Sequence, residues 1–427
     1  MSRSFYQTKP SKWRSAGGRI AIGSAVFALG ALLLLGCQDP DQPDTPSGFG
    51  QRIPWVGMAF DILAADLDGD SRPDLTVVDH GGNQAQIFYQ QPPRQFTAGP
   101  RFDGVGFHPG NLFRWPGEPA RFLLSAEGDN AIRVLSPDKA AGFKVESQLE
   151  AVKPRYGNLF RWPGWGDSLV LSPFDMDSLF LLKRFDPGTG KAEETLQIAL
   201  AEQPPSVLWP GPLTVTDIDR DGSDDILYAT PITRQVFAVQ APKNTESKSK
   251  KKAKGKPKPN PIKPRLLAES PGWGGPTQVL AADLDHDGVD DLLVPDETKP
   301  GKINVIMNDG QGQFTVTQPL DSPNELGITK LQTAIDHDGQ RYILAAGFGV
   351  MALHQVPEQW QVGQPMVSRH VRWKRGDYAT ALALHDLDGD GWLDAVLARQ
   401  QGGELRVLYG PLWENFKQWS DPSVDLD

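Results

Sequence analysis

Cysteine is almost missing from this sequence, since Cys37 is the only one in 427 residues. A single thiol excludes an internal disulfide, and it excludes the paired cysteines of zinc ribbons and CxxCH haem sites. The chain also lacks a Gly-x-Ser-x-Gly elbow, an HExxH helix and a phosphate-binding glycine loop. We therefore assign no catalytic residue. Acids outnumber bases by 53 to 43, which argues against nucleic acid as a partner.

The N-terminal segment is basic and then uncharged. Residues 1–19 carry five basic residues and no acid, and the uncharged residues 20–36 lead directly into Cys37. This order is typical of a lipoprotein signal peptide over residues 1–36 with lipidation at Cys37. An uncleaved membrane anchor is the alternative. We expect an exported, lipid-anchored protein of the cell envelope, held in the outer membrane if the cell is Gram-negative, with residues 37–52 as a flexible tether.

Four segments share one spacing of aspartates, D-x-D-x-D-x-x-x-D. They begin at Asp66, Asp217, Asp283 and Asp386, and each lies between short apolar stretches that are typical of strands. The distances between the four starts correspond to about three, one and two units of roughly 50 residues each. Such spacing predicts further units in which the aspartates have been lost.

The missing units can be found between the acidic ones. Residues 110–117 (GNLFRWPG) recur letter for letter at 157–164, and residues 333–339 are a degenerate acidic copy. Seven units of this length predict an all-β fold, a seven-bladed β-propeller of four-stranded blades. We expect the propeller over residues 53–420, followed by a tail at 421–427. A Lys/Pro-rich insertion at 242–264 should be disordered between blades four and five, as a basic arm or as a solvated loop.

Oxygen ligands at alternate positions of a tight loop suit a hard cation that takes six to eight oxygens. Magnesium would need stricter octahedral geometry, and no His or Cys cluster favours zinc. These loops and their flanking strands resemble FG-GAP/VCBS repeats, the blades of integrin α-chain propellers, over nearly the whole of residues 53–420. The resemblance implies about four structural Ca²⁺ ions. The predicted ligands are Asp66, Asp68, Asp70, Asp74, Asp217, Asp219, Asp221, Asp225, Asp283, Asp285, Asp287, Asp291, Asp386, Asp388, Asp390 and Asp394.

Tryptophan, proline and glycine gather in the segments that lead into the blades, on the face expected to lie opposite the acidic loops. An exposed tryptophan ring there would form a ligand mouth. The alternative is that these tryptophans wedge between blades. The possible mouth residues are Trp55, His80, His108, Arg155, Trp209, Trp273, Trp373 and Tyr378.

Two functions remain open at this stage. The first is a monomeric recognition or adhesion module that is stabilised by calcium and binds a glycan or a protein. The second is a carbohydrate-active enzyme, since some polysaccharide lyases use related propellers, and His80, His108 and Arg155 would then be the first residues to test.

Overall fold

The computed structural model describes residues 50–92, 94–117, 119–174, 176–200, 210–242, 262–324, 326–373, 377–400 and 403–419. The predicted signal peptide, Cys37, most of the tether, Trp209, residues 243–261 of the insertion and the tail at 421–427 lie outside this part. Among the described residues, no helix is both long enough and apolar enough to cross a membrane.

The described strands form seven antiparallel sheets. Blade 1 holds β2 (Ala59–Ala65), β3 (Asp74–Asp79), β4 (Gln84–Gln91) and β5 (Gln95–Phe102), followed by a short 3₁₀ turn, η1 (Asp103–Val105). Blade 2 holds β6 (Pro109–Trp115), β7 (Arg121–Ala126), β8 (Ala131–Asp138) and β9 (Gly142–Glu150). Blade 3 holds β10 (Pro154–Trp162), β11 (Gly166–Pro173), β12 (Ser178–Lys183) and β13 (Glu194–Ala199). Blade 4 holds β14 (Thr214–Thr216), β15 (Asp225–Thr230), β16 (Gln235–Val239) and β17 (Pro264–Glu269).

The last three blades follow the same order. Blade 5 holds β18 (Leu280–Ala282), β19 (Asp291–Pro295), β20 (Lys302–Asn308) and β21 (Phe314–Val316), with β22 (Leu320–Asp321) added against β20. Blade 6 holds β23 (Ile328–Ile335), β24 (Arg341–Gly347), β25 (Val350–Gln355) and β26 (Val367–Arg372). Blade 7 holds β27 (Ala379–His385), β28 (Asp394–Arg399), β29 (Glu404–Leu408) and β1 (Gly50–Pro54).

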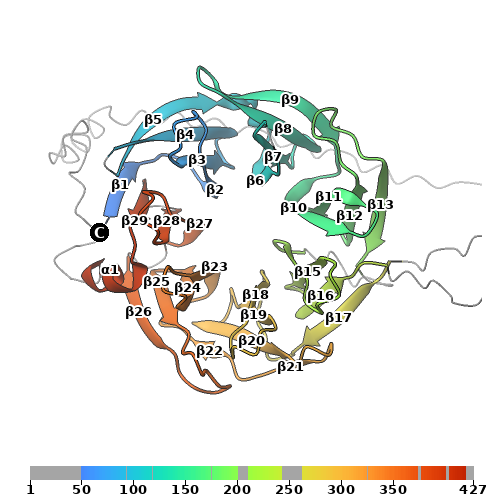
Figure 1. Ribbon diagram of the computed structural model, residues 1–427, viewed down its shortest axis with the longest axis vertical. Coiled ribbons are helices and arrows are strands. Elements are labelled where there is room, and N and C mark those ends of the chain that lie inside the picture. The colour runs from blue at the N-terminus through green and yellow to red at the C-terminus, as the bar shows by residue number, and fades with distance from the viewer. Residues whose placement is uncertain are drawn as a thin grey trace, which may run out of the picture. The chain divides into compact units, whose positions relative to one another are not determined.

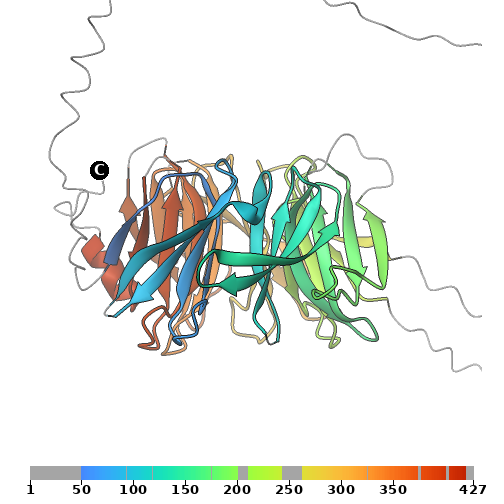
Figure 2. The same cartoon turned by 90° about the horizontal axis from the view of Figure 1, so that it is seen from above.

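The seven sheets stand in a closed ring, so the predicted seven-bladed all-β propeller is confirmed. The first strands of neighbouring blades contact each other all the way round, from β2 through β6, β10, β14, β18, β23 and β27 back to β2. Figure 1 shows first strands nearest the centre of the ring, and Figure 2 shows the blades edge-on. The residues that begin these strands therefore meet around one axis.

Strand β1 closes the ring, because the first described residues pair with the last strand of the chain. Gly50 to Pro54 pair antiparallel with Leu408 to Glu404, and Ile53 is buried in a cluster that also contains residues of blade 1. The propeller therefore begins at Gly50 and not at residue 53. The last three residues expected in the tether belong to this strand.

Second strands are the most buried elements of the ring. All residues of β3, β15 and β28 are buried, because hydrophobic clusters cover both faces of each blade where it meets its neighbours. Burial on both faces explains the continuous apolar runs after the acidic loops. A strand with one exposed face would instead alternate apolar and polar residues.

Two features of the fold differ from the sequence prediction. Strands β16 and β17 both belong to blade 4, so the Lys/Pro-rich insertion joins the third and fourth strands of one blade and does not separate blades four and five. The chain also forms an unpredicted helix, α1 (Leu412–Trp419), which contacts β25 and β26. Its residues Leu412 and Phe416 are buried there, which shields apolar surface of blade 6 from water.

Candidate functional site

The four acidic loops occupy equivalent places in blades 1, 4, 5 and 7. Each connects the first strand of its blade to the second, as predicted, so all four lie at the end of the ring where first strands finish. The residues that begin the first strands lie at the other end, since each is paired with the last residues of the antiparallel second strand, as Ala59 is with Asp79. The propeller thus has an acidic-loop face and an opposite face.

The same hydrogen bonds shape all four loops. The carboxylate at the first loop position accepts the amide of the sixth, at 2.9–3.2 Å, in Asp66, Asp217, Asp283 and Asp386. The carboxylate at the ninth position accepts the amide of the second, at 2.7–3.1 Å, in Asp74, Asp225, Asp291 and Asp394. Each loop is therefore pinned by its own acids at both ends.

Backbone conformation also repeats from loop to loop. The fourth and sixth positions have positive φ in every loop, including the non-glycine residues Ser71, Arg220 and His286. A side chain at positive φ costs conformational energy unless the surroundings hold it in place. Glycine, which adopts positive φ without strain, fills the remaining fourth and sixth positions.

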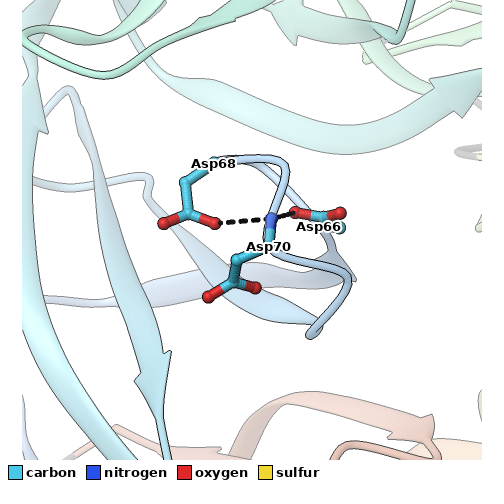
Figure 3. A group of neighbouring side chains, drawn as sticks. All are labelled: Asp66, Asp68 and Asp70. Atoms are coloured by element: carbon cyan, nitrogen blue, oxygen red, sulfur yellow. Dashed lines mark hydrogen bonds between the residues drawn. The ribbon is translucent and has the colours of Figure 1, made fainter.

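Three carboxylates converge in each loop. One oxygen from each lies within 4.8 Å of the others in four groups: Asp66, Asp68 and Asp70; Asp217, Asp219 and Asp225; Asp283, Asp285 and Asp287; Asp386, Asp388 and Asp394. Figure 3 shows the Asp70 amide between the carboxylates of Asp66 and Asp68, to both of which it donates at 3.2 Å. The remaining predicted ligands, Asp74, Asp221, Asp291 and Asp390, lie in the loops but outside these groups.

The donor set of these groups fits a hard divalent cation. All donors are carboxylate oxygens, and two of them, Asp219 Oδ1 and Asp283 Oδ1, are buried without a hydrogen-bond partner. A buried carboxylate oxygen without a partner is costly, and a coordinated cation would remove that cost. The loops of blades 4 and 5 therefore offer an oxygen site that the protein itself leaves unsatisfied.

Arginines from neighbouring blades reach two of the loops. Arg94 of blade 1 forms ion pairs with Asp388 and Asp390 of blade 7, and Arg341 of blade 6 lies 3.2 Å from Asp283 of blade 5. These contacts tie adjacent blades together. They also supply positive charge to carboxylates that would otherwise repel one another.

The ninth-position aspartates have strongly shifted acidity. Burial, with a smaller contribution from neighbouring loop carboxylates, raises the pKa of Asp225, Asp291 and Asp394 from 3.8 to about 7. Backbone amides that donate to these groups only partly offset the rise. Without a cation, the loops therefore hold protons that an unfolded chain would release.

This shift predicts that stabilisation by calcium increases with pH. A carboxyl whose folded pKa is raised stabilises the fold below pH 4 and loses that contribution as the pH rises through 7. The free energy of unfolding of the calcium-free propeller should fall across this window, whereas calcium bound in the loops would compensate the negative charge that the lost protons expose. Melting curves with calcium and with chelator, at pH 6 and pH 8, should show the larger difference at pH 8. An equal or smaller difference at pH 8 would contradict this linkage.

The three described tryptophans of the predicted ring do not form an exposed ring. Trp55, Trp273 and Trp373 are 3%, 4% and 8% exposed. Each lies in a cluster with residues of two adjacent blades: blades 7 and 1, 4 and 5, and 6 and 7 respectively. The alternative that these side chains wedge between blades is therefore correct, because a large apolar side chain gains more from that burial than from exposure.

Other predicted mouth residues do come together on the face opposite the acidic loops. The rings of His80 and His108 are 4.8 Å apart, and His80 stacks on Phe60 at 5.1 Å. The Arg155 guanidinium lies 5.5 Å from the centre of the same Phe60 ring. Tyr378 lies on the same face, directly before β27, but outside this cluster, and its ring is tilted against that of Phe348 with the centres 5.0 Å apart.

Four residues of this cluster were missed in the sequence analysis. They are Phe60, Asp61, Tyr156 and Lys330, all at the beginnings of first strands in blades 1, 3 and 6. The only sequence signal that could have marked them as mouth residues is their position near the beginning of a first strand. Together with His80, His108 and Arg155 they form what we call the axial mouth.

The axial mouth is recessed but reached by solvent. Asp61, Tyr156 and Lys330 are each half-buried, and burial raises the pKa of Asp61 and Tyr156 and lowers that of Lys330. Burial also lowers the pKa of His80, with smaller contributions in the same direction from His108 and Arg155, so the His80 imidazole is neutral at pH 7. Partly buried charged and polar groups interact strongly with a ligand that displaces the water around them.

A separate cavity of about 600 Å³ opens beside the acidic loop of blade 5. It is lined by Asp285, His286, Met307 and residues 358–362. None of the predicted mouth residues lines it.

No family model matches the chain, and no curated protein matches it. Among solved structures, a lectin of Agrocybe aegerita, described for its specific recognition of non-reducing terminal N-acetylglucosamine, is 14% identical. That alignment covers 74% of this chain and 80% of the lectin, with a TM-score of 0.46.

Proposed function

We propose that this protein is a recognition module of the cell envelope, anchored by a lipid on Cys37, that binds a saccharide at the axial mouth. The observation that carries the proposal is the division of chemistry between the two propeller faces. One face holds four loops of convergent carboxylates, and the other holds a cluster of aromatic rings with two cations. Cation binding and ligand binding can thus take place without competing for the same residues.

Calcium on the acidic-loop face would have a structural role. The convergent carboxylates of each loop would hold the ion, supplying the cross-links that a chain with one cysteine cannot obtain from disulfides. Because each loop joins the first two strands of its blade, bound calcium would fix the ends of the strands that surround the axis. A more rigid ring would keep the mouth residues of different blades in register.

The axial mouth has the composition of a saccharide site. Phe60, Tyr156 and the His80–His108 pair offer flat rings, while Arg155 and Lys330 offer polar groups beside them. Sugar rings pack their C–H faces on aromatic rings and take hydrogen bonds at their edges. The residues come from four different blades, so only the assembled propeller presents them together.

Saccharide binding should be lost when the aromatic floor of the mouth is removed. Phe60→Ala removes the ring against which His80, Tyr156 and Arg155 pack. We expect its affinity for the oligosaccharides that bind the unmodified protein to fall at least about tenfold. Glycan-array screening in calcium would identify the ligands, and calorimetry would measure the loss. Phe314→Ala, on the outer strand β21, is the matched control and should bind normally. Unchanged binding by Phe60→Ala would place the ligand elsewhere.

Catalysis is the second candidate function, and the geometry of His80 favours it. Its Nδ1 lies 2.8 Å from the carbonyl oxygen of Pro109, so this nitrogen donates and Nε2 keeps its lone pair. A neutral imidazole held in one orientation beside Arg155 and Tyr156 could act as a general base. Product formation from a bound oligosaccharide, abolished in His80→Gln with binding retained, would assign this activity. Binding without any product would leave recognition as the function.

A further inference from the structure

Two cations of the axial mouth share one aromatic ring. The Arg155 guanidinium and the Lys330 ammonium lie 5.5 and 5.8 Å from the centre of the Phe60 ring. Arg155 lies near the start of β10 in blade 3, Lys330 near the start of β23 in blade 6 and Phe60 near the start of β2 in blade 1. Three blades that are not neighbours therefore bring two positive charges to the same point near the axis.

Neither cation forms an ion pair within the described part of the chain. The nearest acid on the same side, Asp61, already accepts hydrogen bonds from Asn111 Nδ2 at 2.7 Å and from the amides of Leu112 and Ile62, both at 2.9 Å. Arg155 Nε is buried without an acceptor. Two half-buried cations close to each other, neither of them in an ion pair with a described residue, form a favourable place for an anion.

Arg155 is held ready for such an anion. Its guanidinium also lies 4.8 Å from the centre of the Phe174 ring and 5.7 Å from that of Tyr156, so aromatic faces surround it on several sides. Stacking of this kind restricts the plane of the guanidinium, and the Arg155 side chain also forms a hydrogen bond with the Tyr156 side chain. An arginine fixed in this way recognises a planar carboxylate by paired hydrogen bonds.

We propose that the axial mouth binds an acidic saccharide, with the carboxylate of a hexuronate residue placed at Arg155 and Lys330. This assignment rests on the proposed saccharide-binding function and names the class of its ligand. The carboxylate would lie against the two cations beside Phe60, and the sugar ring would pack on the aromatic floor formed by Phe60 and Tyr156.

Charge near the mouth favours a single negative charge over a phosphate dianion. Asp61 and Glu297 both interact electrostatically with Lys330, and the exposed Glu297 interacts with Arg155 as well. A second negative charge on the ligand would be repelled by these acids, whereas one carboxylate would sit between the cations. The exposed ring of Phe107, stacked on His108 at 4.1 Å, extends the flat surface for a further sugar unit.

The test compares a trigalacturonate with its methyl ester and with a neutral galactose trisaccharide, by calorimetry at saturating calcium. We expect the trigalacturonate to bind at least about tenfold more tightly than either uncharged compound. Arg155→Gln and Lys330→Gln should each remove most of this preference. Arg161→Gln is the matched control, because Arg161 lies on the same strand β10, is exposed and pairs with Asp167 at the other end.

The outcomes separate this proposal from the proposed function. Equal binding of charged and neutral trisaccharides, with both lost in Phe60→Ala, would overturn the hexuronate assignment and leave saccharide recognition standing. Binding of inorganic phosphate or an acidic peptide in preference to trigalacturonate would also overturn it. Failure of every saccharide to bind a folded, calcium-loaded propeller would overturn both. Arg155→Lys provides a second variant, which should keep the charge but lose most of the preference for a planar carboxylate.

Discussion

Removal of calcium should lower the melting temperature of the propeller (residue 46 onward) on the order of 10 °C. At a calcium concentration about 100-fold above Kd, one site contributes about 2.7 kcal/mol to the free energy of unfolding. Four sites would contribute about 10 kcal/mol, which corresponds to a shift of this size for a domain of several hundred residues. Differential scanning calorimetry in calcium and in chelator measures the difference directly.

Loop variants show whether the effect comes from the acidic loops. Asp219→Asn changes the loop of blade 4 by one charge while keeping the size of the side chain, and it should remove part of the calcium-dependent rise. Asp321→Asn is the control, because the Asp321 side chain is 79% exposed and pairs with Lys302 on blade 5, away from every acidic loop. Melting curves that coincide with and without calcium would mean that the loops do not stabilise the fold by binding the ion.

Truncation of strand β1 should open the ring. A protein that starts at Trp55 loses five paired residues on β29 and the buried side chain of Ile53. Backbone hydrogen bonds at about 1 kcal/mol each and an isoleucine at about 2 kcal/mol place the expected loss on the order of 5 kcal/mol. The outer edge of β29 would also be left unpaired, which favours association of one ring with another.

The control for this truncation begins at residue 46 and keeps all of β1. We expect it to be monomeric and to melt cooperatively, while the protein that starts at Trp55 melts several degrees lower and forms oligomers in size-exclusion chromatography. A shorter protein that melts at the same temperature and stays monomeric would show that β1 does not hold the ring closed.

Repeat spacing was sufficient to predict seven blades and hence the ring, because the acidic loops recur at multiples of one blade length. Each acidic loop joins the first two strands of its blade. The conserved geometry of those loops follows from a local pattern of nine residues, so their strands and turns could be placed from the sequence. Closure by Gly50–Pro54 could not, since it depends on a pairing with Leu405 and its neighbours that is distant in the chain. The helix Leu412–Trp419 was missed for a similar reason, because its burial depends on blade 6.

The residues of the axial mouth could not be predicted from the sequence, for a physical reason. Tryptophan in the segment before a blade can be exposed to a ligand or buried between blades, and only the assembled ring shows that Trp55 and Trp273 are buried. Conversely, Phe60 and Lys330 are 270 residues apart and look like ordinary strand residues, yet they meet at the axis. Long-range convergence of this kind leaves no local signal.

Calcium stoichiometry tests the central proposal most directly, since the proposed structural role of calcium requires one ion in each acidic loop. Native mass spectrometry of the propeller after exchange into calcium should show four ions bound per chain, falling to three when Asp217 and Asp219 are both changed to asparagine. A wild-type propeller that binds no calcium, or a stoichiometry that the double substitution leaves unchanged, would contradict the account.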